Sequence, residues 1–259
     1  MTRTAPPPRL RDAIATPAGK AAYVRRLFAT IADRYDLITV VLSFGLDQRW
    51  KRRLVRLAAP GPSDRVLDLA CGTGDIARLA AARGADVVGL DLVPRMIEKA
   101  RHRDPGRRTK LLAGDMLALP FPDAAFDLVT TGYGLRNVPD LDRALAEIRR
   151  ILRPGGRVVS LDFTRPRPPV LWAVCRLYLS AVGGALGWLL HRDPDTYRYI
   201  PESLRTFPRA DELVERLRRH GFVDVEWRRV LGGLLAIHVA RTSRSAEARS
   251  ADPIRPDRT

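Results

Sequence analysis

Residues 66–75 read Val-Leu-Asp-Leu-Ala-Cys-Gly-Thr-Gly-Asp, an apolar run that passes through two closely spaced glycines into a helical pattern. The run at 66–69 is typical of a buried strand. Gly72 and Gly74 allow backbone dihedrals, and a close approach of a ligand, that a Cβ would prevent. The helical pattern begins at Asp75. A strand, a glycine turn and a helix in this order predict an α/β fold that binds a ligand at its first turn.

Short apolar runs and helical patterns alternate along the chain from this segment onward. The predicted strands are Val66–Leu69, Asp86–Leu90, Lys110–Ala113, Phe126–Thr130, Arg157–Phe163, Phe222–Val230 and Leu234–Ala240. The predicted helices are Asp75–Arg83, Pro94–His102, Leu141–Leu152 and Asp211–His220. Alternation of this kind predicts a mostly parallel seven-stranded sheet with helices on both faces. The last two strands are joined by Gly232-Gly233, which predicts a closing antiparallel hairpin.

The remaining segments are arranged around a single domain, which we place at residues 20–241. Residues 1–19 are rich in Pro, Ala and Arg and are predicted to form a flexible arm, with no pattern typical of a secretory signal. A helix predicted over Ala21–Arg34 opens an N-terminal helical cap at residues 20–60. Residues 242–259 are rich in Ser, Arg and Asp and are predicted to be a disordered tail.

Residues 170–190 form an apolar stretch with a single charge, at Arg176. The stretch is long enough to span a bilayer, but its three glycines weaken a continuous helix. Three interpretations stay open. A pair of buried helices is favoured, a helical lid over an apolar ligand at residues 166–208 comes second, and a transmembrane span is the least favoured.

Composition limits the partners and the compartment. The net charge is +16, but all but four of the 45 basic residues are arginine, they are scattered, and only 7% of residues are aromatic. A nucleic-acid binder would show clustered charge with aromatic residues between, so no nucleic-acid partner is expected. A basic surface remains compatible with an anionic membrane. Cys71 and Cys175 make no disulfide framework and favour a reducing cytoplasm, and the four histidines lack metal-ligand spacing, so no metal is expected.

Acidic residues follow three successive predicted strands. Asp68 would repel a pyrophosphate at the glycine turn but suits an ammonium or sulfonium group. Asp91 can accept two hydrogen bonds from ribose hydroxyls, and Asp115 can bond the amine of adenine while Met116 covers the ring. Together these residues predict S-adenosylmethionine (SAM) rather than a dinucleotide. Taken alone, each acid could instead cap the turn that follows it. Cys71 has no neighbouring histidine to activate it and is interpreted as a small turn residue.

From about residue 23 to residue 240 the chain resembles the UbiE/MenG family of SAM-dependent enzymes that C-methylate quinone-ring precursors. The stretches that carry the resemblance are Tyr35-Asp36 with Leu42-Ser-Phe-Gly45 and Trp50, Gly132-Tyr-Gly-Leu-Arg-Asn-Val138, Arg153-Pro-Gly-Gly-Arg157 with Asp162-Phe163, and the segment 193–205. The resemblance implies a Rossmann-like class I methyltransferase fold, SAM as cofactor, and a prenylated quinol of menaquinone or ubiquinone biosynthesis as substrate.

By position, the family's SAM contacts fall on Thr73, Asp91, Asp115 and Met116. With Asp68, Gly72 and Gly74 these residues make up the predicted cofactor-binding set. The chain departs from the family at a few positions. It has Ile38-Thr39 for Met-Asn, Asp47 for a common His, Gly132 for a serine that contacts the cofactor, and Asp162 for Glu. These departures concern the substrate end more than the cofactor end.

The chemistry that the resemblance implies is attack of an electron-rich ring carbon on the SAM methyl group. Arg136 and Asn137 follow the fourth strand, at the edge of the sheet where such ligands bind. We expect Arg136 to stabilise the phenolate or to hold a water that takes the proton, and Tyr133 and Tyr35 to touch the ring. The alternative for Arg136 is an ion pair with Asp140.

Other functions and partners stay open. The chain could methylate another lipid-like acceptor, such as a sterol or a phospholipid amine, or could be a non-catalytic quinone-binding subunit. We expect a cytoplasmic protein that contacts the inner face of the cell membrane peripherally, and a homodimer is left open.

Overall fold

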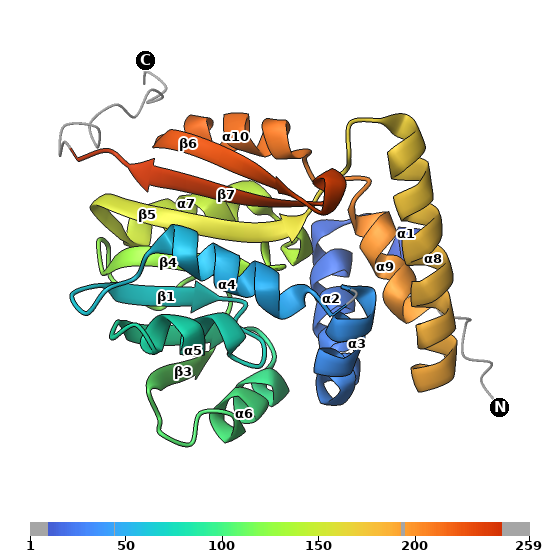
Figure 1. Ribbon diagram of the computed structural model, residues 1–259, viewed down its shortest axis with the longest axis horizontal. Helices are drawn as coiled ribbons and strands as arrows, with labels where there is room; N and C mark the ends of the chain where they lie inside the picture. Colours follow the sequence, from blue (N-terminus) through green and yellow to red (C-terminus); the bar gives the residue numbers. More distant parts are fainter. Residues whose placement is uncertain (1–9, 44, 193–194, 245–259) are drawn as a thin grey trace, which may run out of the picture.

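The computed structural model describes residues 10–43, 45–192 and 195–244, and only the backbone at 195 and 197. Seven strands form one sheet in the order β3-β2-β1-β4-β5-β7-β6 (Figure 1). They are β1 (Arg65–Leu69), β2 (Asp86–Asp91), β3 (Thr109–Ala113), β4 (Phe126–Gly132), β5 (Leu152–Phe163), β6 (Phe222–Val230) and β7 (Leu235–Thr242).

The first five strands are parallel, and β7 pairs antiparallel with both β5 and β6. The predicted α/β class, with its mostly parallel sheet and C-terminal antiparallel hairpin, is confirmed. The hairpin connection is longer than a two-residue turn, because the irregular turn η3 (Leu231–Gly233) and Leu234 lie between the strands. Gly232 and Gly233 both have positive φ there, a conformation that glycine adopts at no steric cost.

Helices cover both faces of the sheet. One face carries α4 (Asp47–Ala58) and α5 (Asp75–Ala81), and the other carries α7 (Leu141–Ile151) and α10 (Ala210–Arg219). In α7 the buried residues recur with helical spacing, at Ala144, Leu145, Ile148 and Ile151, so one face of the helix joins the core. Asp140 caps α7, since its side chain accepts a hydrogen bond from the Arg143 backbone N–H. A further helix, α6 (Pro94–His102), packs along β2 and β3.

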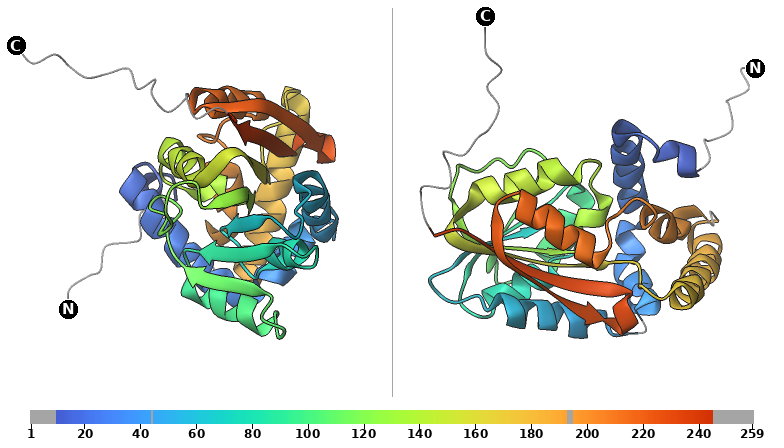
Figure 2. Two further views of the ribbon diagram at one scale, coloured as in Figure 1. Left: turned by 90° about the vertical axis from the view of Figure 1, so that its left-hand side faces the viewer. Right: turned by 90° about the horizontal axis from the view of Figure 1, so that it is seen from above.

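A helical cap lies beyond the carboxyl ends of the parallel strands (Figures 1 and 2). Its members are α1 (Leu10–Ala13), α2 (Pro17–Ile31), η1 (Ala32–Arg34), α3 (Tyr35–Leu42), α8 (Pro169–His191) and α9 (Asp195–Ser203). The predicted arm at 1–19 is therefore partly wrong, because α1 and the start of α2 lie inside it. Thr16 caps α2 by accepting from the Gly19 N–H, and Pro17 occupies the first turn. Residues 1–9 and 245–259 lie outside the described part of the chain.

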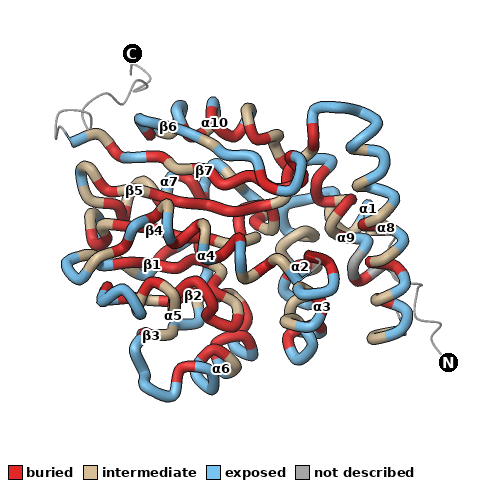
Figure 3. Tube along the Cα trace, in the orientation of Figure 1, coloured by how far each residue is buried: buried red, intermediate tan, exposed pale blue. Residues whose placement is uncertain are grey.

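The favoured interpretation of residues 170–190, a pair of buried helices, is wrong. The segment is the single helix α8, whose buried residues are Leu179, Gly183, Gly184 and Gly187, while its outer face is exposed (Figure 3). The glycines do not break the helix because they lie on the face that packs against the rest of the cap. A Cβ on Gly184 would lie 3.3 Å from Nε of Arg198 on α9, so the missing side chain permits this close approach.

Candidate functional site

A large pocket, called pocket A here, opens at the carboxyl ends of β1 to β4. Its empty volume is about 820 Å³, which includes space open to solvent. Residues from α2 form its outer wall. Of the predicted cofactor-binding residues, Gly72, Asp91, Asp115 and Met116 line it. Four residues that lie far apart in the sequence therefore meet in one pocket, as expected where parallel strands end at the same edge of a sheet.

Asp91 is fixed at the end of β2 by two backbone N–H groups. Its Oδ2 accepts a hydrogen bond from Gly72 N at 2.8 Å, and its Oδ1 accepts one from Val93 N at 2.9 Å. Burial raises the pKa of this carboxyl group above its usual value. Each carboxylate oxygen can accept more than one hydrogen bond. The two oxygens of Asp91 can therefore still accept hydrogen bonds from two hydroxyl groups of a ligand in pocket A.

Asp115 and Met116 line pocket A just after the end of β3. Oδ1 of Asp115 accepts from Leu117 N at 2.9 Å, which holds the exposed carboxylate at the rim. Met116 is buried and presents an apolar side chain to the pocket. Gly134 keeps this wall close to the first turn, because a Cβ there would lie 2.8 Å from the Cβ of Ala70. A polar rim beside an apolar wall suits a purine base.

Three predicted cofactor residues do not line pocket A. Both Asp68 oxygens are already bonded, to Thr130 Oγ1 at 2.8 Å and to Ala77 N at 3.0 Å, so Asp68 caps the start of α5 and supports the turn from beneath. Burial raises its pKa to about 7. The hydroxyl of Thr73 is bonded to Asp36, and Gly74 packs against α6. These contacts support the turn-capping alternative for Asp68, and its contact with a ligand stays a prediction.

A second pocket, called pocket B, adjoins pocket A and is enclosed by α2, α3, α9 and the loop after β4. It contains about 630 Å³ of empty space and is mostly apolar, with Ile38 and Leu42 of α3 on one side. Arg136 is its main charged group and is itself buried. Its Nη1 donates to Ser203 Oγ at 2.5 Å, and its Nε lies 3.4 Å from Oδ1 of Asp162. The predicted alternative, an ion pair with Asp140, is wrong.

Four residues line both pockets and form the wall between them: Phe28, Tyr35, Tyr133 and Asn137. The predicted catalytic residues Tyr35, Tyr133 and Asn137 are therefore brought together, and Arg136 lies next to them. Tyr133 has a φ of +62°, a backbone conformation that is rare outside glycine and is often found at functional sites. Asn137 Nδ2 donates to the Tyr133 carbonyl at 2.7 Å, and its buried Oδ1 has no partner within the described residues. An unsatisfied acceptor between two pockets suits a ligand that carries a hydroxyl or amine.

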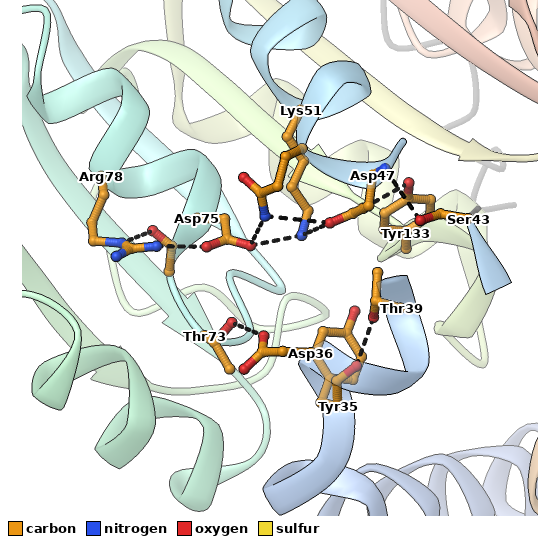
Figure 4. Close-up of polar contacts among 12 residues, drawn as sticks. Tyr35, Asp36, Thr39, Ser43, Asp47, Lys51, Thr73, Asp75, Arg78 and Tyr133 are labelled. Atoms are coloured by element: carbon orange, nitrogen blue, oxygen red, sulfur yellow. Dashed lines mark hydrogen bonds and ion pairs between the residues drawn. The ribbon is translucent and has the colours of Figure 1, made fainter. Parts of the chain in front are cut away.

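A buried ionic network beside this wall was missed from the sequence (Figure 4). Lys51 Nζ lies 2.6 Å from Oδ2 of Asp47 and 2.8 Å from Oδ2 of Asp75. Arg78 Nη2 extends the network from Oδ1 of Asp75 toward solvent, and Oη of Tyr133 donates to Oδ1 of Asp47 at 3.1 Å. The i,i+4 spacing of Asp47 and Lys51 is a signal for an ion pair on a helix, but nothing in the sequence places that pair against Asp75.

Two predicted absences concern the same region. Burial raises the pKa of the Cys71 thiol well above its usual value, which suits the interpretation of Cys71 as a turn residue. Within residues 10–43, 45–192 and 195–244, no cluster of three or more His, Cys, Asp or Glu could hold a metal ion. Gly132 stands where the resemblance predicts a serine. A Cβ at this position would lie 2.6 Å from Cδ1 of Ile76, so a serine would fit only if the Ile76 side chain shifted.

Comparison with known proteins connects this geometry to a family. The profile of the ubiE/COQ5 methyltransferase family matches residues 17–242. A demethylmenaquinone methyltransferase of Thermus thermophilus is 44% identical over 82% of this chain and 98% of its own length. One of Roseiflexus castenholzii is 41% identical over 86% of this chain and 94% of its own.

Solved structures support the fold. A SAM-dependent methyltransferase of Thermotoga maritima superposes with a TM-score of 0.62 at 19% identity, covering 84% of this chain and 99% of that one. Phosphoethanolamine N-methyltransferase 2 of Haemonchus contortus, solved with SAM, superposes with a TM-score of 0.59 at 17% identity over 75% of this chain and 52% of its own. At these identities the similarity concerns the fold alone.

Proposed function

Because the chain belongs to the ubiE/COQ5 methyltransferase family, we propose that it transfers the methyl group of SAM to a ring carbon of a prenylated quinol, with demethylmenaquinol as its substrate. The observation that carries the proposal is the wall of Phe28, Tyr35, Tyr133 and Asn137, which separates a pocket suited to a nucleoside from a mostly apolar pocket. A methyl donor in the first pocket and a ring in the second would meet at this wall.

The chain is a SAM-dependent methyltransferase, and the predicted cofactor is confirmed by the family. The residues of pocket A fit the cofactor, because Asp91 retains acceptor capacity for ribose hydroxyls and Asp115 for the purine amine. Met116 supplies the apolar cover, and Gly72 leaves the backbone open, with the Tyr35 ring 3.8 Å from where a Cβ would stand. When bound, SAM supplies an electrophilic methyl group.

Pocket B is proposed to orient the quinol. Arg136 can donate to an oxygen of the ring and so stabilise the negative charge that develops there. Asp162 and Ser203 hold the guanidinium in place, so little reorganisation is needed as that charge forms. Arg136 remains protonated throughout, and so it acts as a charge stabiliser rather than as a base. The apolar walls from α2 and α3 would receive the fused ring and the first prenyl units.

The experiment is methyl transfer from labelled SAM to demethylmenaquinol with a short prenyl tail, followed by mass spectrometry of the product. Menaquinol that carries the new methyl on carbon supports the proposal. Transfer only to the 2-methoxy-6-polyprenyl-1,4-benzoquinol precursor of ubiquinone would move the function to that pathway. Transfer to a sterol or phospholipid amine, or SAM binding without transfer to any acceptor, would favour one of the other two functions.

We also propose that α8 places the protein on the inner face of the cell membrane. In the described part of the chain α8 alone is long and apolar enough to cross a bilayer by length and composition, yet its inner face packs against α3 and α9. The exposed outer face includes Val170, Leu177, Trp188 and Leu189. An apolar face of this kind beside basic groups is typical of an interfacial helix.

Basic side chains next to α8 support this orientation. An open groove between α1, α8 and α9 is lined by five arginines and one carboxylate: Arg11, Arg165, Arg176, Arg198, Arg205 and Glu202. Anionic lipid head groups would meet an excess of positive charge there. Leu179 on the inner face of α8 belongs to the main core, so its replacement would test stability rather than membrane contact.

Sedimentation with vesicles tests the membrane proposal. The protein should bind vesicles rich in phosphatidylglycerol, and salt should release it, because screening weakens the contribution of the arginines. Leu177→Asn with Leu189→Asn should weaken binding, whereas Val223→Asn, at an exposed position on β6, should not. Equal binding by all variants would overturn the proposal, and retention that only detergent reverses would favour a spanning helix.

A further inference from the structure

We propose that Tyr133 and Asp47 form a proton relay that takes the hydroxyl proton of the quinol as its ring carbon accepts the methyl group. The inference rests on the proposed function and extends it, because it assigns the proton acceptor. Tyr133 would touch the substrate, while Asp47 acts through Tyr133 and does not line pocket A or pocket B.

The position of Tyr133 makes it the entry to the relay. It lines pocket A, pocket B and a small polar cavity under the glycine turn. Its Oη donates to Oδ1 of Asp47, so its own lone pairs remain available to accept a hydrogen bond from a hydroxyl in pocket B. The Tyr133 backbone is held in its strained conformation by a 2.7 Å hydrogen bond from its N–H to the Leu161 carbonyl, and the ring packs against Phe163 at 5.6 Å between centroids.

The position of Asp47 makes it a proton acceptor that is ready for use. It is 2% exposed and is fixed at the start of α4, where its N–H donates to Ser43 Oγ at 3.1 Å. Its other oxygen contacts Lys51, which is shared with Asp75, and Arg78 completes the network (Figure 4). The four groups carry two negative and two positive charges. Protonation of Asp47 therefore gives the network a net positive charge at the moment when the substrate oxygen loses its proton.

The relay balances protons and electrons. As the ring carbon bonds to the methyl group and the sulfur takes the electron pair of the broken bond, the substrate hydroxyl passes its proton to Oη of Tyr133. Tyr133 passes its own proton to Oδ1 of Asp47, and the substrate is left as a neutral ketone. The ring C–H proton then leaves to water, the oxygen recovers a proton by the reverse route, and the ring is aromatic again.

The acidity of the substrate changes during this step. The quinol hydroxyl starts with a pKa close to that of a phenol, about 10, and becomes a strongly acidic protonated ketone once the carbon is methylated. The proton transfer therefore becomes favourable during the reaction itself. Burial and the Asp47 carboxylate raise the pKa of Tyr133 well above its usual value, so Tyr133 holds one proton at rest and passes it on only as it receives another.

Other titratable groups surround the relay and must be separated from it. Tyr133 is faced by Tyr35 of α3 and Asp162 of β5 as well as by Asp47. Tyr35, whose pKa burial raises to about 12, stays protonated in the assay range. Lys20 of α2 lies near Arg136 and Asp162, and burial lowers its pKa to about 8. Lys20 is present in the wild type and in every variant, so a difference between their pH profiles does not come from it.

The experiment compares wild type, Tyr133→Phe, Asp47→Asn and the double variant with saturating SAM and a short-tailed demethylmenaquinol. Turnover is measured from pH 6 to pH 9.5. Each single change should lower kcat about 100-fold at pH 7 with KM within about threefold, and the double change should cost no more than the worse single one. Asp104→Asn, which alters a buried carboxylate bonded to Thr109 outside both pockets, is the matched control and should keep the wild-type profile.

The pH profile distinguishes a relay from a structural role. Without the relay only quinol that is already ionised can react, so kcat of the variants should rise about tenfold per pH unit toward pH 9.5 and approach the wild type. Tyr133→Phe leaves the Asp47–Lys51 ion pair intact and so keeps the test valid if Asp47→Asn folds poorly. An active wild type whose Tyr133→Phe variant stays within threefold of it, or loses kcat equally at every pH, would overturn the relay and leave the proposed function in place.

Discussion

Replacing Asp91 with alanine should weaken SAM binding and lower fold stability by separable amounts. The carboxylate serves the fold by accepting from Gly72 N and Val93 N, and it serves the ligand with its remaining acceptor capacity in pocket A. Alanine removes both functions and adds no new bulk, so any loss of affinity comes from lost contacts rather than from a clash.

The two magnitudes follow from these contacts. Two hydrogen bonds from ribose hydroxyls to a charged acceptor are worth about 1.5–3 kcal/mol each, and water recovers part of this. We therefore expect SAM affinity to fall by about 2–4 kcal/mol, which is about 30- to 800-fold. The two buried N–H groups also lose their acceptor, which costs about 1–3 kcal/mol of fold stability for each group. Part of this cost is offset, because burial already disfavours the ionised carboxylate that is removed. The free energy of unfolding should fall by about 1–3 kcal/mol.

Isothermal titration calorimetry with SAM measures the first effect, and urea unfolding of the protein without ligand measures the second. Asp104→Asn should lose stability while keeping SAM affinity within about twofold, because Asp104 lies outside pocket A. A folded Asp91→Ala protein with an unchanged SAM dissociation constant would refute the reasoning, and so would tighter binding of NAD than of SAM.

Three further changes test other parts of the site. Arg136→Ala should lower turnover per folded molecule by about 10²–10³ with SAM affinity unchanged, and unchanged turnover would reduce Arg136 to a partner of Asp162. Lys51→Met should lower the free energy of unfolding by about 3–5 kcal/mol, since it leaves the buried Asp47 carboxylate without its cation and removes one of the cations that contact Asp75. Arg95→Met, in an exposed pair, should cost much less, and equal losses would contradict the burial argument. Burial raises the pKa of Asp68 to about 7 in the fold, so the folded state keeps a proton that the unfolded state has lost, and wild-type stability should fall as pH rises from about 4 to about 7. Asp68→Asn should show a smaller fall, and parallel curves in thermal melts would exclude Asp68 as a source of the slope.

The sheet could be predicted from the sequence because each strand is a short apolar run bounded by turn residues. The helix Pro94–His102 was predicted with both of its ends, since proline at the first turn marks its start. The order of strands also explains why Asp91 and Asp115 could be assigned to one pocket. Carboxyl ends of neighbouring parallel strands meet in space, so positions in the sequence translate directly into positions in the site.

Asp68 shows a limit of sequence-based prediction. An acid at the end of the first strand has the same sequence signal whether it faces a ligand or supports the turn. The difference lies in Thr130, which is 62 residues away on β4 and takes one of its oxygens. The ionic network of Asp47, Lys51 and Asp75 was missed for the same reason, because it depends on how α4 packs against α5.

The helix α8 shows a second limit. Hydrophobicity alone suggested burial, and glycine content alone suggested a break. Both signals were outweighed by tertiary packing, since the glycines lie on the buried face, with Gly184 against α9, and several large apolar side chains are exposed. An apolar surface that faces a membrane or a ligand has the same composition as a core helix, so only the structure separates them.

The central claim is that a ring carbon of a prenylated quinol receives the methyl group of SAM. The most direct measurement is a single-turnover reaction of the protein with methyl-labelled SAM and reduced demethylmenaquinol, with the product analysed by NMR. We predict one labelled methyl group per quinol, attached to the ring carbon next to a hydroxyl-bearing carbon. A label on oxygen or nitrogen, or no transfer to the quinol by a protein that binds SAM, would contradict the claim.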